Sequence, residues 1–573
     1  MHSQNTSTPP LKRGSVACRR CRRLRSKCIH SAAPPCDACR RAGPGVAAEC
    51  VFPRKGEKDT DRSFRRRMPP PAALRADPSA PAASRDVPRP LALSAAGLPP
   101  MDQVIAGCRI FVTSYFQLGF IPKTVFMEKL RRDPAAVSPF LLVCILCISA
   151  RFTPVLRNRY GGARQATDYF VAAARAMVPT EMYTPSLERI QAFFLLAISQ
   201  WGDGDRDRSS IDMGVAVRMA ALLKLHCEES YVLPADAPAE DIVQSESARR
   251  TFWMIQSQEN LHSGYKTPAP FPLQDITTLL PCDEKEFAFA CIPPHRAAVA
   301  GTPPAVDKPH LVYAPDRCLF ATLIQVHQLW GRVARRACRA DSAANKRKPW
   351  DTASEYAVTV AELHRWEASL PASHVFSVWN LRGWKTENLH LAYLSMTMVL
   401  RLANIVVRRI YLDDILSELA PHASEMGQPI SAGTSNMAGG ADDGPPVPTV
   451  RYTDAPTGFW DAIAPEGFWE TMATELFFNV EQLHDQIDAY FALRAPEEGF
   501  PQILVFCVYI CGSLASCLWR YPSLCMQRAD KAEGMARRAL EVLGELHQAW
   551  PMSLEWQRGL QKAQEVYISE SNV

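Results

Sequence analysis

The stretch from Cys18 to Cys28 reads CRRCRRLRSKC, and it begins a set of six cysteines that ends at Cys50. The full spacing is C-x2-C-x6-C-x7-C-x2-C-x10-C, with the remaining members at Cys21, Cys36 and Cys39. A C-x2-C pair places two thiolates where one tetrahedral Zn²⁺ can bind both, and each pair here is followed by a third cysteine. Two such ions need about eight sulfur positions. Six cysteines therefore suffice only if two of them each bind both ions.

Metal binding is expected to fold this segment, because about fifty residues cannot bury enough apolar surface by themselves. A structural zinc supplies roughly 10–16 kcal/mol at neutral pH. We expect residues 1–14 to be disordered and residues 15–55 to form a small domain that depends on zinc.

Charge separates this head from the rest of the chain. Residues 12–67 contain 17 Lys and Arg against 5 Asp and Glu, whereas the whole chain has a net charge of only +5, so the remainder is acidic. A basic head on an acidic body is typical of a module that neutralises phosphates while the rest avoids nucleic acid. The basic residues that follow the cysteines suit a nuclear localisation signal or nonspecific phosphate contacts: Arg62, Arg65, Arg66 and Arg67.

The head resembles the zinc binuclear cluster (Zn2Cys6) family of fungal transcription factors. The match consists of the six cysteines together with Arg22, Lys27 and Pro34. The resemblance implies two short helices around a two-zinc cluster in which Cys18 and Cys36 bridge the ions. One ion would also bind Cys21 and Cys28, and the other would bind Cys39 and Cys50. The last spacing is longer than usual in the family, so we expect a distended loop there.

The resemblance also implies that the first short helix enters the major groove and reads a CGG-like triplet from Leu24, Arg25 and Lys27. Arginine can bind the O6 and N7 atoms of guanine together, whereas Leu24 donates no hydrogen bond. The residues expected to contact DNA are the basic ones of the opening stretch: Arg19, Arg20, Arg22, Arg23, Arg25 and Lys27.

Disulfide bonds and metal storage fit the six cysteines less well than a zinc cluster does. A set of three disulfides would suit a secreted domain, but the N-terminus has no apolar signal region. A metal buffer would lack the interleaved arginines. A zinc-stabilised protein-interaction cofactor without its own DNA target stays open as an alternative.

Beyond the head, residues 56–100 are basic and then rich in Pro and Ala, which predicts an extended linker without a coiled-coil heptad pattern. The chain could thus bind DNA as a monomer or dimerise through its large domain. Residues 421–458 are rich in Gly, Ser, Pro and Asp and read as a disordered insertion. Apolar periodicity predicts a large all-α domain over 101–420 and 459–573. Its expected helices cover 101–116, 138–151, 164–178, 187–201, 209–226, 245–262, 317–340, 352–370, 386–419, 465–493, 500–520, 528–549 and 553–568.

This body resembles the fungal-specific transcription factor domain over residues 100–410. The best match is ESARRTFWMIQSQE from Glu246 to Glu259, where Glu259 takes the place of the family's usual aspartate. The resemblance implies a regulatory role and small-molecule effectors, although no effector residue follows from a motif.

No common catalytic motif occurs in the body, so we expect no enzyme activity. His226 is interpreted as a core or capping residue, and Cys144 with Cys147 as small buried thiols. Arg249 and Arg250 could pair with an acidic effector, but a helix-surface salt bridge to Glu246 or to another segment is the default.

Two apolar segments allow alternatives. The run from Ile503 to Trp519 reaches the lower length limit of a membrane span, and a buried helix is favoured over it. Aromatic and acidic residues that follow the insertion suit either a segment that recruits coactivators or the start of a packed helix: Phe459, Trp460, Asp461, Glu466, Phe468, Trp469 and Glu470. The sequence thus predicts a nuclear, zinc-dependent, DNA-binding regulator of RNA polymerase II genes. Secondary metabolism is the favoured role by family analogy, with nutrient use or stress resistance as alternatives.

Overall fold

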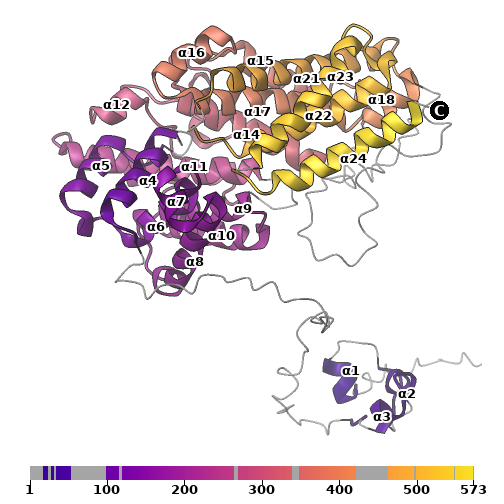
Figure 1. The fold of residues 1–573 in the computed structure, drawn as a ribbon, viewed down its shortest axis with the longest axis horizontal. Helices are drawn as coiled ribbons and strands as arrows, with labels where there is room; N and C mark the ends of the chain where they lie inside the picture. The colour runs from indigo at the N-terminus through magenta and orange to yellow at the C-terminus, as the bar shows by residue number, and fades with distance from the viewer. Residues whose placement is uncertain are drawn as a thin grey trace, which may run out of the picture. The chain divides into compact units, whose positions relative to one another are not determined.

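The computed structural model describes residues 17–23, 28–30, 34–48, 50–52, 98–114, 119–262, 269–338, 347–420, 463–495, 498–547 and 549–571. The chain divides into two compact units, Met1–Arg89 and Pro90–Val573. All regular structure in the described residues is helical, and no β-strand occurs among them (Figure 1). The predicted fold class, a cysteine-rich head followed by an all-α body, is confirmed. The N-terminus, most of the linker and the insertion lie outside the described residues.

The described residues of the head form three helices of five residues each, α1 (Arg19–Arg23), α2 (Asp37–Arg41) and α3 (Pro44–Ala48). Helices this short are not stable by themselves in water. The buried side chains of the described head residues are all thiols, from Cys18, Cys21, Cys36, Cys39 and Cys50. The described residues of the head therefore form no apolar core of ordinary size, as expected of a domain that a metal folds.

The long spacing between Cys39 and Cys50 contains α3. Gly43 adopts a φ of +108°, which few other residues tolerate, and Pro44 then begins the helix at a position that suits its fixed φ. The amide of Ala47 donates to the carbonyl of Gly43 at 3.0 Å. The extra residues thus form a helical turn.

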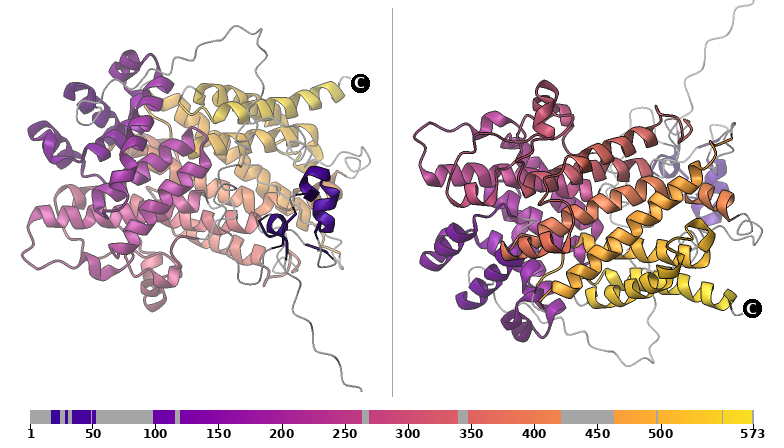
Figure 2. Two further views of the ribbon diagram at one scale, coloured as in Figure 1. Left: turned by 90° about the horizontal axis from the view of Figure 1, so that it is seen from below. Right: turned by 90° about the horizontal axis from the view of Figure 1, so that it is seen from above.

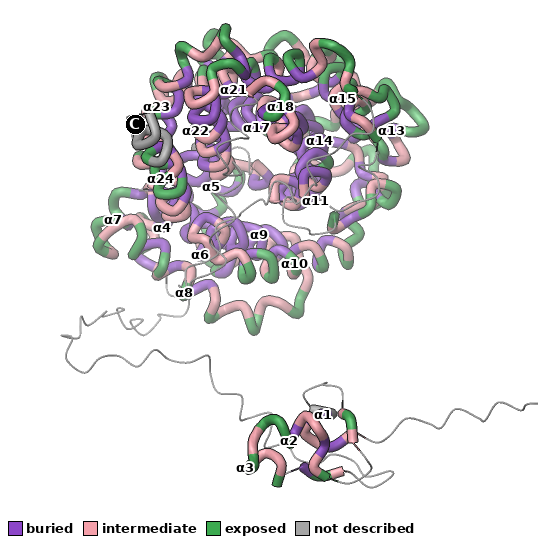
Figure 3. The backbone as a smooth tube through the Cα atoms, turned by 90° about the vertical axis from the view of Figure 1, so that its right-hand side faces the viewer, coloured by how far each residue is buried: buried purple, intermediate pink, exposed green. Residues whose placement is uncertain are grey.

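The first part of the body contains α4 (Met101–Ser114), α5 (Lys123–Arg132), α6 (Pro139–Ser149), α7 (Pro154–Tyr160), α8 (Ala163–Glu181), α9 (Leu187–Gly202), α10 (Arg206–Leu222) and α11 (Ala239–Leu261). Helices α6 and α9 are buried along most of their length and pack against each other (Figure 3). Serine caps start both of them, because Ser138 accepts from the amide of Leu141 and Ser186 accepts from the amide of Arg189. The buried thiols predicted at Cys144 and Cys147 lie in α6 and are confirmed.

The second part of the body contains α12 (Glu284–Ala288), α13 (Pro303–Asp307), α14 (Leu319–Ala337), α15 (Glu355–Ala368), α16 (Val378–Thr386), α17 (His390–Arg409), α18 (Leu412–Leu419), α21 (Phe468–Leu493), α22 (Ile503–Arg520), α23 (Ala529–Leu546) and α24 (Ser553–Ser571). Helices α14, α17, α21, α22 and α23 lie side by side in that order (Figures 1 and 2). Short 3-10 helices connect the longer ones: η3 (Pro134–Ala136), η4 (Ala150–Phe152), η5 (Glu228–Tyr231), η6 (Leu273–Asp275), η7 (Pro309–Val312) and η9 (Pro522–Leu524). One continuous core of apolar side chains extends from Val104 to Leu560.

The structure corrects the single helix predicted over 386–419. Helix α17 ends at Arg409 and α18 begins at Leu412, with no Gly or Pro at the break. Tyr411 lies at the break, where its ring packs on Tyr356 and its hydroxyl accepts from Arg336 at 2.7 Å. This tertiary contact has no local signal. Helices α5, α7 and α16 were likewise not among the predicted ranges.

Two described helices, α17 and α22, are long and apolar enough to span a membrane by composition alone. The apolar window of α17 is entirely buried in the body, and 67% of the window of α22 is buried. Helix α22 packs against α17, α21, α23 and α24. This packing favours the buried-helix interpretation of the run from Ile503 to Trp519.

The aromatic residues near the insertion divide between described and undescribed positions. Phe468 and Trp469 begin α21, and their rings lie 5.5 and 6.1 Å from the ring of Trp350. Trp469 is buried. These two residues therefore form the start of a packed helix, whereas Phe459, Trp460 and Asp461 lie outside the described residues.

Candidate metal centre and nucleic-acid interface

The six cysteines of the head meet in two groups of four sulfur atoms. One group contains Cys18, Cys21, Cys28 and Cys36, and the other contains Cys18, Cys36, Cys39 and Cys50. Within each group all ligand atoms lie within 4.8 Å of one another. The two groups share Cys18 and Cys36, the pair that the family resemblance implies as bridging ligands.

The sulfur separations fit tetrahedral zinc. The Sγ atom of Cys36 lies 3.7 Å from that of Cys18 and 3.6 Å from that of Cys21. The Sγ atoms of Cys18 and Cys39 are 3.8 Å apart. Four sulfurs at about 2.3 Å from one ion have edges of about 3.8 Å. A disulfide would need about 2.05 Å, so these separations exclude a disulfide within any of the three pairs.

The two halves of the head have the same pattern of hydrogen bonds from backbone amides to cysteine sulfurs. The amide of Cys18 donates to the sulfur of Cys28, and the amide of Cys36 donates to the sulfur of Cys50, both at 3.4 Å. The residues after the shared cysteines link the halves, since the amide of Arg19 donates to the carbonyl of Val51. In the matching bond, the amide of Asp37 donates to the carbonyl of Ile29. Each half thus holds the other in register, and amide donors partly neutralise the thiolates.

The crowded thiols of the head differ from one another in pKa. Burial raises the pKa of Cys18. Burial also acts on Cys36, but hydrogen bonds from the Cys39 amide and from neighbouring thiols outweigh it and lower the pKa of Cys36 to about 6. Thiolate is the form that binds zinc, so the shared position of Cys36 already favours the ligand form.

Four of the basic residues expected to contact DNA, Arg19, Arg20, Arg22 and Arg23, belong to α1. Arg19 and Arg20 are half-buried, and the guanidinium of Arg20 lies 3.9 Å from the sulfur of Cys39. Arg22 and Arg23 belong to α1, but their side chains are outside the described part. Arg25 and Lys27 also lie outside it. The structure therefore places α1 directly on the cysteine cluster, with Arg20 facing a thiol.

Two further arginines were missed by the sequence analysis. Arg40 and Arg41 follow Cys39 in α2, as Arg22 and Arg23 follow Cys21 in α1, and both are exposed. Arg40 pairs with Asp37 at 3.6 Å, and Arg41 donates to the carbonyl of Asp37. The repeated letters CRR, which end each C-x2-C pair, were the signal that could have identified them.

The described residues of the body contain a buried cluster of charged side chains around Glu246. Among the described residues, the groups able to hold a metal ion are the two cysteine sets of the head. In the body, Glu246 accepts from Arg296 at 2.8 Å and from Arg250 at 3.3 Å. Burial opposes ionisation of Glu246, but Arg296, Arg250 and Arg249 outweigh it and hold the pKa of this carboxyl below its usual range.

Two arginines of this cluster, Arg249 and Arg250, form their ion pairs within the protein itself. Arg249 binds both carboxylate oxygens of Glu228, at 2.6 and 2.7 Å. Arg250 is fully buried, pairs with Glu284 and donates to the carbonyl of Cys282 at 2.9 Å. The expected salt bridges to Glu246 and to other segments are present, but both arginines and Glu246 are buried, so the expected location on the helix surface is wrong. His226 is half-buried and its ring stacks on the ring of Phe271.

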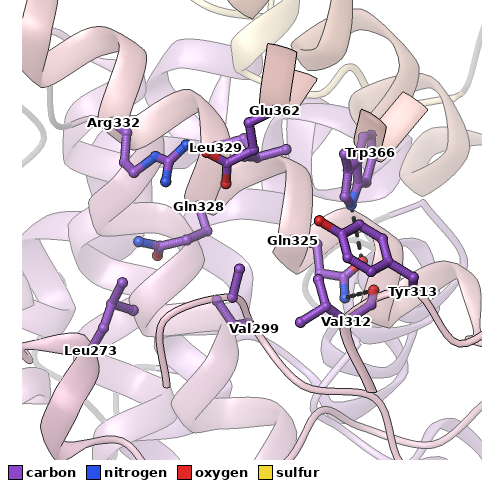
Figure 4. Close-up of a pocket in the computed structure, with 11 residues that line it drawn as sticks. Leu273, Val299, Val312, Tyr313, Gln325, Gln328, Leu329, Arg332, Glu362 and Trp366 are labelled. Carbon is purple, nitrogen blue, oxygen red and sulfur yellow. Dashed lines mark hydrogen bonds and ion pairs between the residues drawn. The ribbon is translucent and has the colours of Figure 1, made fainter. Parts of the chain in front are cut away.

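A small pocket lies between α14 and α15, where Arg332 pairs with Glu362 and Trp366 donates to the side chain of Gln325 (Figure 4). Its volume is about 20 Å³, enough for about one water. It is too small for an effector molecule in this conformation.

Known proteins that resemble this chain are regulators of transcription. Residues 110–294 match the family described as "Fungal specific transcription factor domain". An "Uncharacterized transcriptional regulatory protein" of Schizosaccharomyces pombe is 25% identical over 68% of this chain and 61% of its own length. The "Zn(2)-C6 fungal-type transcription factor FTF1c" of Fusarium oxysporum f. sp. lycopersici is 25% identical over 50% of this chain and 32% of its own length.

The chain thus spans 61% of the first of these relatives and about a third of the second. No solved structure matches it. The names of the relatives describe regulators of transcription and not enzymes, and the cysteine cluster fits their zinc-binding type. Residues 110–294 therefore match a fungal-specific transcription factor domain, and the chain with its cysteine cluster resembles the fungal Zn2Cys6 regulators of transcription.

Proposed function

We propose that this regulator binds two zinc ions through its six head cysteines, with Cys18 and Cys36 bridging the ions. The observation that carries the proposal is the pair of overlapping four-sulfur sets that share these two residues. Each set supplies the four donors that a closed structural zinc site needs. The ions would serve a structural purpose, holding α1 and α2 against each other.

With both zinc ions bound, the head binds duplex DNA in a sequence-specific manner. Helix α1 starts directly after the shared ligand Cys18 and carries Arg22 and Arg23 on a segment that leads to Arg25 and Lys27. Arg25 is the residue proposed to bind guanine in a CGG-like triplet, since its guanidinium can engage O6 and N7 together. Arg40 and Arg41, exposed on α2, add cations for phosphate contacts.

Arg20 takes a different role from the one expected at first. Its guanidinium lies 3.9 Å from the sulfur of Cys39 and so acts on the thiolate cluster. A cation beside a metal-bound thiolate offsets part of the negative charge of the cluster. We place Arg20 among the residues that stabilise the head, with any phosphate contact secondary.

In the cell the chain would act in the nucleus on genes transcribed by RNA polymerase II, and a secondary-metabolite gene cluster is the proposed target class. Coactivators and a small effector are proposed partners of the helical body, as the family resemblance implies. The family names support the regulator, and the target class follows only from analogy.

Binding-site selection with the zinc-loaded full-length chain tests this function. A random duplex pool is passed over the protein through several rounds and then sequenced. Enrichment of a G-containing triplet is expected, and it should vanish in the Cys18→Ser variant. Retention of DNA without any enriched sequence would favour the alternative of a cofactor that has no DNA target of its own.

A further inference from the structure

Helix α10 presents an unusual outer face. Its inner side packs on α9 through the buried residues Ser209, Met213, Ala216, Met219 and Ala220. The opposite side carries Asp207, Ile211, Gly214 and Arg218, and all four are exposed. Their spacing of four, three and four residues places them on one line along the helix. Helix α10 lies at the surface of the body (Figures 1 and 3).

This line of residues is apolar at its centre and charged at its ends. Ile211 is 67% exposed, and Leu222 beyond the far end is 61% exposed. Asp207 and Arg218 form no ion pair within the described part of the chain. This arrangement makes no evident contribution to the fold of a single copy. It consists of an exposed isoleucine near a glycine, with a charge of opposite sign at each end of the line.

Gly214 has no role in the packing of its own body. A Cβ atom built on Gly214 meets nothing within 4 Å. Glycine inside a helix costs about 1 kcal/mol relative to alanine. A glycine on an open helix face does allow another helix to approach closely, since no side chain intervenes.

The line of exposed residues on α10 is complementary to the same line on an antiparallel copy of the helix. An antiparallel copy of α10, related by a two-fold axis between residues 212 and 213, places Asp207 opposite Arg218 and Ile211 opposite Gly214. Opposite charges meet twice, and a large side chain twice meets the residue that has none. Contacts of this reciprocal kind are what a two-fold symmetric dimer requires.

We propose that two copies of this chain associate through α10, with Ile211 of each copy seated over Gly214 of the other and Asp207 of each paired with Arg218 of the other. The occupant is a second copy, because the charge pattern matches its own reverse. This inference goes beyond the proposed function and stands without it. If both hold, the dimer carries two DNA-reading heads and favours paired half-sites.

Sedimentation equilibrium of the full-length, zinc-loaded chain without DNA tests the proposal. The wild type is expected to show a reversible monomer–dimer equilibrium. Gly214→Leu should remain monomeric at all concentrations, because the new side chain occupies the place of Ile211 from the other copy. Its fold is preserved, since the position is open within one copy. Gly534→Leu in α23, another helix position with open space, is the matched control and should dimerise like the wild type.

Charge exchange makes the test specific for the antiparallel arrangement. Asp207→Arg alone and Arg218→Asp alone should each weaken self-association by about tenfold or more, since like charges then face each other twice. An equimolar mixture of the two variants should recover a heterodimer, and the double variant should recover the homodimer.

Three outcomes would overturn the proposal. The first is a wild type that stays monomeric at every concentration, and the second is a dimer that survives Gly214→Leu. The third is a mixture of the two charge variants that fails to associate. If the wild type is monomeric and a different protein binds to α10, the first of these outcomes applies. The exposed face of α10 would then be a binding site for that protein.

Discussion

The sulfur atoms of Cys18 and Cys36 lie 3.7 Å apart, and each of them belongs to both sets of four sulfur atoms in the head. The other four cysteines belong to one set each. The two kinds of position should therefore differ when they are substituted.

Substitution of a shared cysteine should remove more zinc than substitution of a terminal one. Cys36→Ser takes one thiolate from both sets, so we expect it to abolish binding of both ions. Cys28→Ser takes a thiolate from one set only and should leave the other set complete. Zinc content of the purified full-length variants, measured by inductively coupled plasma mass spectrometry, checks this.

Cys291→Ser is the matched control, because Cys291 is an exposed thiol of the body. It should retain the wild-type zinc content. Equal zinc loss in Cys36→Ser and Cys28→Ser would contradict the sharing of Cys36 between two ions.

Removal of zinc should unfold the head and spare the body. The described core of the head consists of thiols, whereas the body has its own continuous apolar core. After treatment with a strong chelator, limited proteolysis should cut between residues 17 and 52 within the time that leaves the long helices of the body uncut. Far-ultraviolet circular dichroism should lose little intensity. A head that resists protease after chelation would contradict metal-dependent folding.

Arg25→Ala should reduce discrimination between the selected site and random DNA. Loss of a bidentate contact to guanine costs about 1–3 kcal/mol at that base. Fluorescence anisotropy with both duplexes, over a range of salt concentrations, measures specific and nonspecific affinity. Arg41→Ala should instead weaken both affinities alike and reduce the salt dependence. Equal loss on both duplexes for Arg25→Ala would refute its role in reading bases.

Glu259→Gln should stabilise the body at high pH and have little effect at low pH. Burial raises the pKa of Glu259 from 4.5 to about 7. The folded state then holds a proton that the unfolded state has lost, so this carboxyl makes stability fall as pH rises from 4.5 to 7. The amide removes this cost, which we place on the order of 1–3 kcal/mol at pH 8.

Thermal unfolding of wild type and Glu259→Gln at pH 5 and pH 8 measures the difference. The two proteins should unfold at similar temperatures at pH 5, and the variant should unfold at a higher temperature at pH 8. Glu240→Gln, on the exposed first turn of the same helix, serves as control. A variant that is equally stabilised at both pH values would contradict the ionisation argument.

Arg250→Ala should destabilise the body strongly. Arg250 is fully buried and compensates Glu246 and Glu284, while also donating to carbonyls of the segment that precedes α12. Removing one partner of a buried ion pair costs about 3–5 kcal/mol, since a charge is left without compensation. Urea unfolding measures this loss, with the exposed Arg365→Ala of α15 as control. A loss below about 1 kcal/mol would place the pair among weak surface bridges.

The sequence alone sufficed for the parts that depend on short-range chemistry. Thiolate spacing determined the expected ligands, because two cysteines three positions apart lie on one turn wherever the chain goes. Apolar periodicity located most helices of the body to within a few residues, since burial of one face leaves its repeat in the sequence. The Arg and Lys residues between Cys18 and Cys28 indicated nucleic-acid binding, because they are clustered within one short stretch of the sequence.

Only the tertiary structure decided which distant groups meet. Glu284 follows Arg250 by 34 residues, and no local pattern assigns it as the partner. The break between α17 and α18 depends on Tyr411 meeting Arg336, and the outer face of α10 is recognisable only once α9 covers its inner face. Such contacts depend on how helices pack in three dimensions, and residues far apart in the chain leave no periodic trace of one another.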